Sequence, residues 1–184
     1  MKKIIILGST GSIGLKTLNI ISNDFYKYKI ELLSTHKNVS KLMKQAKQFR
    51  VKNVIITDHK KFLNAQKKYK NLEINIYNTF DILDKRYKKH EIHYSMLSVV
   101  GIDGLKSIVN LIKISKNLAV VNKESLICGW NIIVKLLNKY KSNFIPIDSE
   151  HFSIKNLLKN YNTEDIKNIF ITASGGPFLN KKKN

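Results

Sequence analysis

Residues 4–14 read IIILGSTGSIG, four apolar residues followed at once by a loop with three glycines. The apolar run predicts a buried β-strand, and residues from about Leu15 to Ser22 predict a helix. Glycines let a backbone turn tightly and approach a ligand, and the N–H groups that begin a helix attract anions. The stretch therefore predicts a strand, loop and helix that bind a dinucleotide pyrophosphate, although the G-x-x-G-x-x-G spacing also fits an ordinary turn.

Further β-type segments follow the first one, separated by stretches long enough for helices. Two of these stretches, 39–49 and 105–112, carry apolar residues at helical spacing and are expected to face the core. This alternation predicts an α/β fold, a Rossmann-like parallel sheet with flanking helices. The more polar segment 62–89 is expected to form solvent-covered helices beside a short edge strand. The β-type segments are residues 3–7, 29–34, 53–57, 94–100, 118–121, 144–147 and 169–172.

Composition limits the classes of partner. The 184 residues, 43% of them apolar, suffice for one domain and part of another, and the net charge of +20 raises the question of nucleic acid. Of the 33 basic residues only Arg50 and Arg86 are arginine, the side chain favoured for recognising phosphates and bases. We therefore expect a solvated surface that attracts small anions and does not bind nucleic acid, with a basic nucleic-acid-binding module as an alternative.

The apolar stretch that starts at Ile4 is shorter than that of a signal peptide, and no later segment approaches the length of a membrane span, so we expect a cytoplasmic location without a membrane partner. Cys128 is the single cysteine, which excludes an intrachain disulfide. We expect it to be a buried structural thiol.

Polar clusters follow the predicted strands at their carboxyl ends. Parallel strands end at one edge of a sheet, so these clusters are expected to share a ligand-binding edge. Lys37 follows the second strand, where an adenosine 2′-phosphate needs a cation, whereas Glu31 lies too early to bind a ribose hydroxyl; NADP is favoured over NAD. The clusters are the glycine loop, Lys37-Asn38, Gly101, Asn122-Lys123-Glu124, Asp148-Ser149-Glu150-His151 and Ser174-Gly175-Gly176-Pro177.

The cluster at 148–151 offers hard oxygen ligands. Asp148 and Glu150 are two residues apart, and their carboxylates suit Mg²⁺ or Mn²⁺. Alternatively, Asp148 or Ser149 only caps the helix that follows. His151 either contacts the metal ligands without binding the metal itself or is an ordinary residue of the following helix, and we expect the latter.

Two further clusters suggest contacts with the reacting molecules. Asn122-Lys123-Glu124 combines an amide, a cation and a carboxylate where a nicotinamide or a substrate head group would lie, and an ion pair between Lys123 and Glu124 is the alternative. Ser174 with the two glycines after it forms either a phosphate cradle or a plain turn before Pro177.

Taken in order, these segments resemble the 1-deoxy-D-xylulose 5-phosphate reductoisomerase family over essentially the whole chain. Asn122-Lys-Glu-Ser followed by Asp148-Ser-Glu-His is more specific than the glycine loop. The resemblance implies an enzyme of non-mevalonate isoprenoid biosynthesis, which uses NADPH and a divalent metal, Mg²⁺ or Mn²⁺, to convert 1-deoxy-D-xylulose 5-phosphate into 2-C-methyl-D-erythritol 4-phosphate. Another NADP-dependent dehydrogenase domain is the alternative enzyme.

The resemblance also implies roles for individual residues. It implies that Lys123 and Glu150 are catalytic and that Asp148 and Glu150 bind the metal. Substrate contacts would come from Lys123, Ser149, Glu150 and Ser174. The NADPH site would be formed by Thr10, Gly11, Ser12, Ile13, Lys37, Asn38, Asn122 and Glu124.

The same resemblance implies the domain organisation. Residues 1–147 are expected to form an NADPH-binding domain, and residues 148–184 the beginning of a catalytic domain that continues in the family well beyond Asn184. We therefore expect a truncated chain that is inactive alone, from an enzyme whose full-length form is a homodimer. His36 departs from the family, which usually has glycine before the Lys-Asn pair.

Overall fold

The computed structural model describes residues 1–99, 101 and 104–171. The chain divides into two compact units, residues 1–147 and 148–184. No helix within the described ranges is long and apolar enough to span a membrane.

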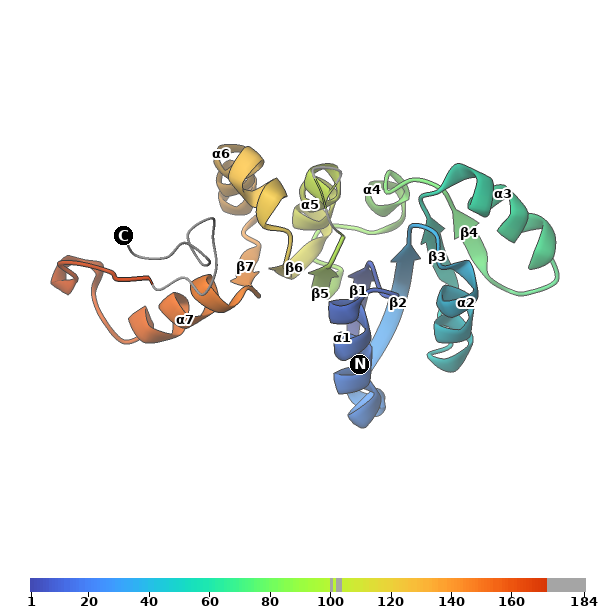
Figure 1. Cartoon of the computed structure of the whole chain (residues 1–184), viewed down its shortest axis with the longest axis horizontal. Helices are drawn as coiled ribbons and strands as arrows, with labels where there is room; N and C mark the ends of the chain where they lie inside the picture. The colour runs from blue at the N-terminus through green and yellow to red at the C-terminus, as the bar shows by residue number, and fades with distance from the viewer. Residues whose placement is uncertain (100, 102–103, 172–184) are drawn as a thin grey trace, which may run out of the picture. The chain divides into compact units, whose positions relative to one another are not determined.

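The first unit is built on a sheet of seven strands that all run parallel (Figure 1). Their order is β4-β3-β2-β1-β5-β6-β7, so the chain builds outward from β1 to β4 and then returns to the other side of β1. This order confirms the Rossmann-like fold and places its topological switch point between β1 and β5. The strands are β1 (Lys2–Leu7), β2 (Tyr28–Thr35), β3 (Asn53–Ile56), β4 (Asn75–Tyr77), β5 (Ile92–Leu97), β6 (Ser115–Val120) and β7 (Asn143–Pro146).

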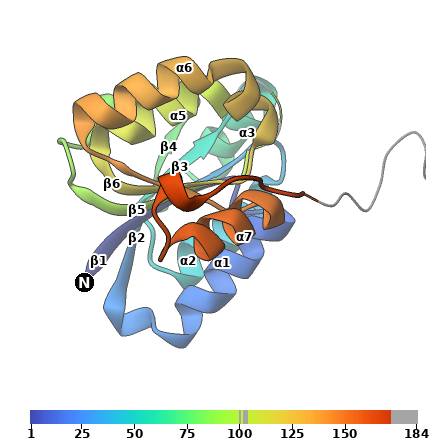
Figure 2. The same ribbon diagram turned by 90° about the vertical axis from the view of Figure 1, so that its left-hand side faces the viewer.

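Helices cover both faces of this sheet. Figure 2 shows α1 and α2 against one face and α5 and α6 against the other. The two stripes of apolar residues at 39–49 and 105–112 lie on α2 and α5, as predicted. The helices of the unit are α1 (Ser12–Asn23), α2 (Val39–Gln48), α3 (His59–Lys68), α4 (Ile82–Arg86), α5 (Gly104–Ile114) and α6 (Lys123–Tyr140), and residues Phe25–Lys27 form a 3-10 turn.

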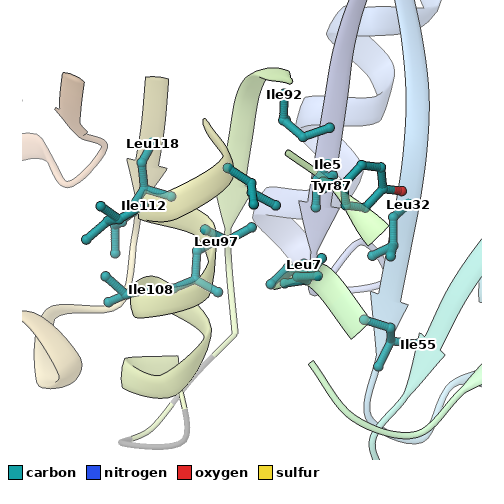
Figure 3. Close-up of a cluster of buried hydrophobic side chains, with 14 of the residues drawn as sticks. Ile5, Leu7, Leu32, Ile55, Tyr87, Ile92, Leu97, Ile108, Ile112 and Leu118 are labelled. Carbon is teal, nitrogen blue, oxygen red and sulfur yellow. The ribbon is translucent and has the colours of Figure 1, made fainter. Parts of the chain in front are cut away.

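The core lies on both sides of β1, because successive residues of a strand point to opposite faces. Ile5 and Leu7 pack in the cluster that includes Ile108 of α5 (Figure 3). Ile4 and Ile6 belong to the cluster on the side of α1 and α2. These four β1 side chains are almost completely buried, and each contributes about 1.5–3 kcal/mol to folding. A strand buried on both faces explains the continuous apolar run.

The polar segment 62–89 has the predicted form. The three-residue strand β4 lies at the edge of the sheet, between α3 and α4 in the chain. Only Ala65 of α3 and Leu83 of α4 are buried. These helices therefore present most of their surface to solvent.

The expectation of a buried thiol is wrong, because Cys128 is exposed on α6. The buried residues of this helix are Ser125, Gly129 and Ile133, which lie four residues apart on one face. Cys128 precedes Gly129 by one residue and therefore lies about 100° around the helix from that face.

The second unit contains α7 (Ser149–Leu158) and a 3-10 turn at Thr163–Asp165. The predicted strand at 169–172 is not formed at 169–171, where the chain has no regular structure, and Thr172 lies outside the described residues. A strand needs a partner for its ladder of hydrogen bonds, and residues 148–171 of this unit contain no other strand.

Candidate functional site

The glycine loop forms a tight turn between β1 and α1. Gly8 has φ +81°, and a Cβ there would lie 2.7 Å from the carbonyl oxygen of Ser98, just after β5. A Cβ on Gly14 would lie 2.4 Å from the carbonyl oxygen of Gly8. Both positions therefore require glycine, the first for its backbone angle and its neighbour, the second for the close approach of α1 to the loop.

Side-chain hydrogen bonds attach this loop to the ends of the neighbouring strands. The Gly8 N–H donates to Ser34 Oγ at 2.9 Å, and the hydroxyls of Thr10 and Thr35 lie 2.7 Å apart. On the other side, Ser98 Oγ donates to the carbonyl oxygen of Leu7 at 2.8 Å. The loop is thus fixed to β2 and to the end of β5, across the switch point.

The N-terminus of α1 differs from those of four other helices. Asn38, Asp58, Asn122 and Asp148 each accept a backbone N–H into their own side chain and cap α2, α3, α6 and α7. At α1 the capping position is Gly11, which has no side chain, and the first turn contains no acidic residue. Ser12 and Ile13 therefore begin a helix whose positive end has no side-chain cap, as an anion site requires.

A cavity of about 790 Å³ opens at the switch point. Of the eight predicted NADPH-binding residues, Thr10 and Gly11 line it and the other six do not. His36 lines it in place of its neighbours Lys37 and Asn38, which are exposed in the turn between β2 and α2. The lining residues are Gly8, Thr10, Gly11, Ser34, Thr35, His36, Thr57, Asn78, Thr79, Phe80, Ser98, Val99 and Lys106.

Several lining residues were missed by sequence reasoning. Thr57, Asn78 and Ser98 directly follow β3, β4 and β5, so the rule that polar residues at strand ends share one edge would have found them. Phe80 and Lys106 carry no such signal, because they come from the loop before α4 and from α5.

The far end of the cavity is held by side chains from the ends of β2, β3 and β4. His36 Nδ1 lies 3.0 Å from Thr57 Oγ1, and Asn78 Nδ2 donates to the carbonyl oxygen of Ile56 at 2.7 Å. Next to Thr57, the pKa of Asp58 is held below its ordinary value, chiefly by the Lys61 N–H. This end of the site thus combines an imidazole, hydroxyls and a carboxylate that is charged at neutral pH.

Asn122 is buried at the start of α6, and its side chain makes three hydrogen bonds with residues that the structure describes. Its Oδ1 accepts the Ser125 N–H at 2.8 Å, and its Nδ2 donates to the carbonyl oxygens of Val99 and Gly101 at 2.8 and 2.6 Å. Lys123 and Glu124 occupy the first turn of α6 and are exposed. Asn122 thus fixes the loop after β5, while the two charged side chains are accessible to a ligand.

In the second unit, the carboxylate of Asp148 has two oxygens in different situations. Oδ1 caps α7, accepting the His151 N–H at 2.9 Å, and lies 2.7 Å from His151 Nδ1. Oδ2 is buried and has no hydrogen-bond partner among the described residues. The capping role is therefore real, yet it leaves one oxygen for a ligand, and His151 is more than a simple helix residue because it contacts this carboxylate.

Ser149 and Glu150 follow on the exposed side of α7, with Ser149 Oγ donating to Glu150 Oε2 at 3.0 Å. Across the described parts of the chain, no three His, Cys, Asp or Glu side chains gather as a ready metal cage. Ser174, the remaining predicted substrate contact, lies outside the described residues.

The family model of 1-deoxy-D-xylulose 5-phosphate reductoisomerase matches residues 4–129, which is more than half of the chain. The chain belongs to this family. The model of the reductoisomerase C-terminal domain matches residues 144–184. The family resemblance drawn from the motifs is therefore confirmed.

Curated relatives from this reductoisomerase family align with nearly the whole chain. The reductoisomerase of Pelagibacter ubique is 53% identical over 98% of this chain, and that of Caldanaerobacter subterraneus is 42% identical over 100%. In both cases the alignment covers 47% of the relative. The chain thus spans a little under half the length of these enzymes.

Solved structures of the family have the same fold. The Zymomonas mobilis enzyme in complex with NADPH superposes with a TM-score of 0.87 at 28% identity, covering 98% of this chain and 48% of that one. A family structure with NADPH, fosmidomycin and magnesium gives a TM-score of 0.83 at 28% identity, covering 99% of this chain and 47% of that one.

Proposed function

We propose that residues 1–147 bind NADPH and that the chain is the cofactor-binding portion, with part of the metal site, of a reductoisomerase. In the longer protein, these residues would serve the conversion of 1-deoxy-D-xylulose 5-phosphate into 2-C-methyl-D-erythritol 4-phosphate. That protein would act in the cytoplasm as a homodimer, as the family resemblance implies, and the 184-residue chain alone would be inactive.

The observation that carries the cofactor proposal is the uncapped start of α1 beside the 790 Å³ cavity. The pyrophosphate would accept hydrogen bonds from the backbone N–H groups of Ser12 and Ile13, where the helix dipole favours negative charge, whereas the Gly11 N–H already donates to the carbonyl oxygen of Gly8 at 3.1 Å. Thr10 and Gly11 line the cavity at this point. The residues therefore fit the group, because no side chain competes with a phosphate for these donors.

Lys37 and Asn38 supply the proposed preference for NADPH over NADH. They follow β2, whose carboxyl end meets the adenosine ribose in this topology. Lys37 is exposed and places a cation where a 2′-phosphate would lie, while Asn122 and Glu124 would contact the nicotinamide end.

The Oδ2 oxygen of Asp148, which has no hydrogen-bond partner among the described residues, supports the metal proposal. A buried carboxylate oxygen without a hydrogen bond is costly unless a cation meets it, and Mg²⁺ binds few protein carboxylates. Asp148 and Glu150 would hold Mg²⁺ or Mn²⁺, and His151 would orient Asp148 through Oδ1. Ser149 and Lys123 would bind the substrate, as would Ser174.

When bound, the metal would stabilise negative charge on substrate oxygens and NADPH would supply a hydride. The chain's own residues would do the positioning. The capped start of α6 would hold the Lys123 ammonium toward the substrate, and Glu150, beside the metal, would hold or move a proton at its carboxylate. The glycine loop would fix the pyrophosphate of the cofactor at the start of α1.

The test is cofactor binding by the full 184-residue chain, measured by titration of NADPH and NADH fluorescence. We expect NADPH to bind more tightly than NADH and Lys37→Ala to remove most of that preference. Lys44→Ala, on the exposed side of α2, is the matched control and should keep it. Equal affinities for the two cofactors, or an unchanged preference in Lys37→Ala, would contradict the proposed 2′-phosphate contact.

A further inference from the structure

We propose that His36, oriented by Thr57, contacts the 2′-phosphate of the bound cofactor and takes up a proton when that phosphate binds. The proposal rests on the proposed NADPH site. It adds a residue that helps to select NADPH over NADH and makes this preference depend on pH.

His36 directly follows β2 (Tyr28–Thr35), at the strand end that distinguishes a ribose 2′-hydroxyl from a 2′-phosphate in this topology. It lines the switch-point cavity, whereas Lys37 does not. An imidazole thus occupies the cavity wall where the phosphate of NADPH is expected.

A hydrogen bond orients the His36 ring. His36 Nδ1 lies 3.0 Å from Thr57 Oγ1, and the Asp58 N–H donates to the carbonyl oxygen of His36 at 3.3 Å. These contacts attach the residue, side chain and backbone, to the end of β3. The bond to Thr57 engages Nδ1 and fixes the ring, so that Nε2 is left to meet a ligand in the cavity.

Charged side chains lie near His36. Asp58 interacts electrostatically with His36, Lys37 and Lys61, and the Lys61 N–H donates to its carboxylate at 2.8 Å. Lys106, from α5, lines the same cavity but is paired with Asp81 at 2.9 Å. A phosphate that enters beside the Asp58 carboxylate meets a like charge, and a protonated His36 offsets it. Imidazole is the side chain that gains charge between about pH 8 and 5, so phosphate binding draws a proton onto it.

The experiment uses two adenosine probes that differ only in the phosphate, 2′,5′-ADP and 5′-AMP. Both are titrated calorimetrically into the full chain in buffers of different ionisation enthalpy, from pH 8.5 to 6.5. We expect binding of 2′,5′-ADP to take up more protons in the wild type than in His36→Gln. We also expect its affinity relative to AMP to rise by about threefold to tenfold as the pH falls, a rise that His36→Gln removes.

Two more variants keep the test specific. His59→Gln changes an imidazole two residues beyond Thr57 that does not line the cavity, and it should behave as wild type. Thr57→Val should reduce proton uptake by releasing the ring, which also tests the idea if His36→Gln folds poorly. Lys37→Ala should weaken 2′,5′-ADP binding at every pH but leave the proton uptake.

If 2′,5′-ADP binds equally well and with equal proton uptake in the wild type, His36→Gln and Thr57→Val, the role of His36 is overturned and the NADPH site stands. If neither probe nor NADPH binds to the wild-type chain, the proposed function fails and this inference fails with it.

Discussion

Ser9 and Gln45 exchange two hydrogen bonds in the core. Ser9 Oγ donates to Gln45 Oε1 at 2.8 Å, and Gln45 Nε2 donates to the carbonyl oxygen of Ser9 at 3.0 Å. Both residues are buried, one in the glycine loop and the other on the inner face of α2. This reciprocal pair connects the candidate phosphate loop to the helix that follows Lys37 and Asn38.

Replacing Gln45 with Met should destabilise the protein by about 1–3 kcal/mol, because Met fills similar space but leaves the Ser9 hydroxyl and carbonyl without these partners. Urea unfolding measures the change. Gln48→Met, at the exposed end of the same helix, is the control and should change stability by less than about 0.5 kcal/mol. Equal effects of the two substitutions would show that the Ser9–Gln45 pair contributes little.

Gly8→Ala should destabilise the protein more than Gly101→Ala. The two glycines have similar backbone angles, φ +81° and +78°, so both substitutions introduce comparable strain of about 1–3 kcal/mol. A Cβ at Gly8 would meet Ser98 at 2.7 Å, whereas a Cβ at Gly101 would meet none of the described residues within 4 Å. The difference between the two unfolding free energies therefore measures the close approach of the loop to β5. A Gly101→Ala variant that is as unstable as Gly8→Ala would argue against this explanation.

Replacing Asn122 with either Ala or Asp should destabilise the protein. Ala removes the cap of α6, which costs about 0.5–2 kcal/mol, and the two donors to Val99 and Gly101. Asp keeps the cap but directs a carboxylate at those two carbonyl oxygens. Asn38→Asp at the exposed cap of α2 is the matched control, and thermal unfolding should place it close to wild type. A stable Asn122→Asp protein would mean that capping is the whole role of Asn122.

Stability should fall in acid because of His93. Burial, followed by the charges of Lys116 and Lys2, holds the pKa of His93 below its ordinary 6.5, and the Lys3 N–H donates to its Nδ1 at 3.2 Å. The unfolded chain thus binds the proton more readily than the folded one, so stability increases with pH through the interval just below 6.5.

His93→Gln keeps an acceptor for Lys3 but does not titrate, and its stability should change less between pH 7.5 and 5.5 than that of the wild type. Urea unfolding at both pH values gives the comparison, with His59→Gln as the control imidazole. The assignment to His93 would be wrong if His93→Gln lost as much stability in acid as the wild type.

Asp148→Asn should abolish divalent metal binding and preserve the helix. The amide still offers an oxygen to cap α7 but lacks the charge that attracts a cation. Mn²⁺ titration followed by electron paramagnetic resonance measures binding, and circular dichroism monitors the helix. Glu150→Gln should also weaken binding, whereas Glu164→Gln, elsewhere in the second unit, should not. Retention of Mn²⁺ affinity in Asp148→Asn would contradict the proposed ligand.

Much of the fold could be predicted because its signals are local. The apolar run at 4–7 marks a strand buried on both faces, and the stripe at 39–49 marks the inner face of α2. The strand predicted at 169–172 is not formed at 169–171, because β-propensity alone does not make a strand without a neighbouring strand to pair with. The predicted burial of Cys128 was wrong because the exposure of this residue depends on which face of α6 meets the sheet.

For the candidate site, the glycine loop, the polar residues at the strand ends and the family could all be predicted from the amino-acid sequence. These depend on residue type and spacing, which act over a few neighbouring residues. The folded arrangement was needed to show that His36 and Thr57 line the cavity while Lys37 does not. It was also needed to show that one oxygen of Asp148 caps a helix while the other has no hydrogen-bond partner among the described residues. These outcomes depend on where β2 and β3 end relative to each other and on how a single carboxylate is oriented, and packing between distant segments sets both.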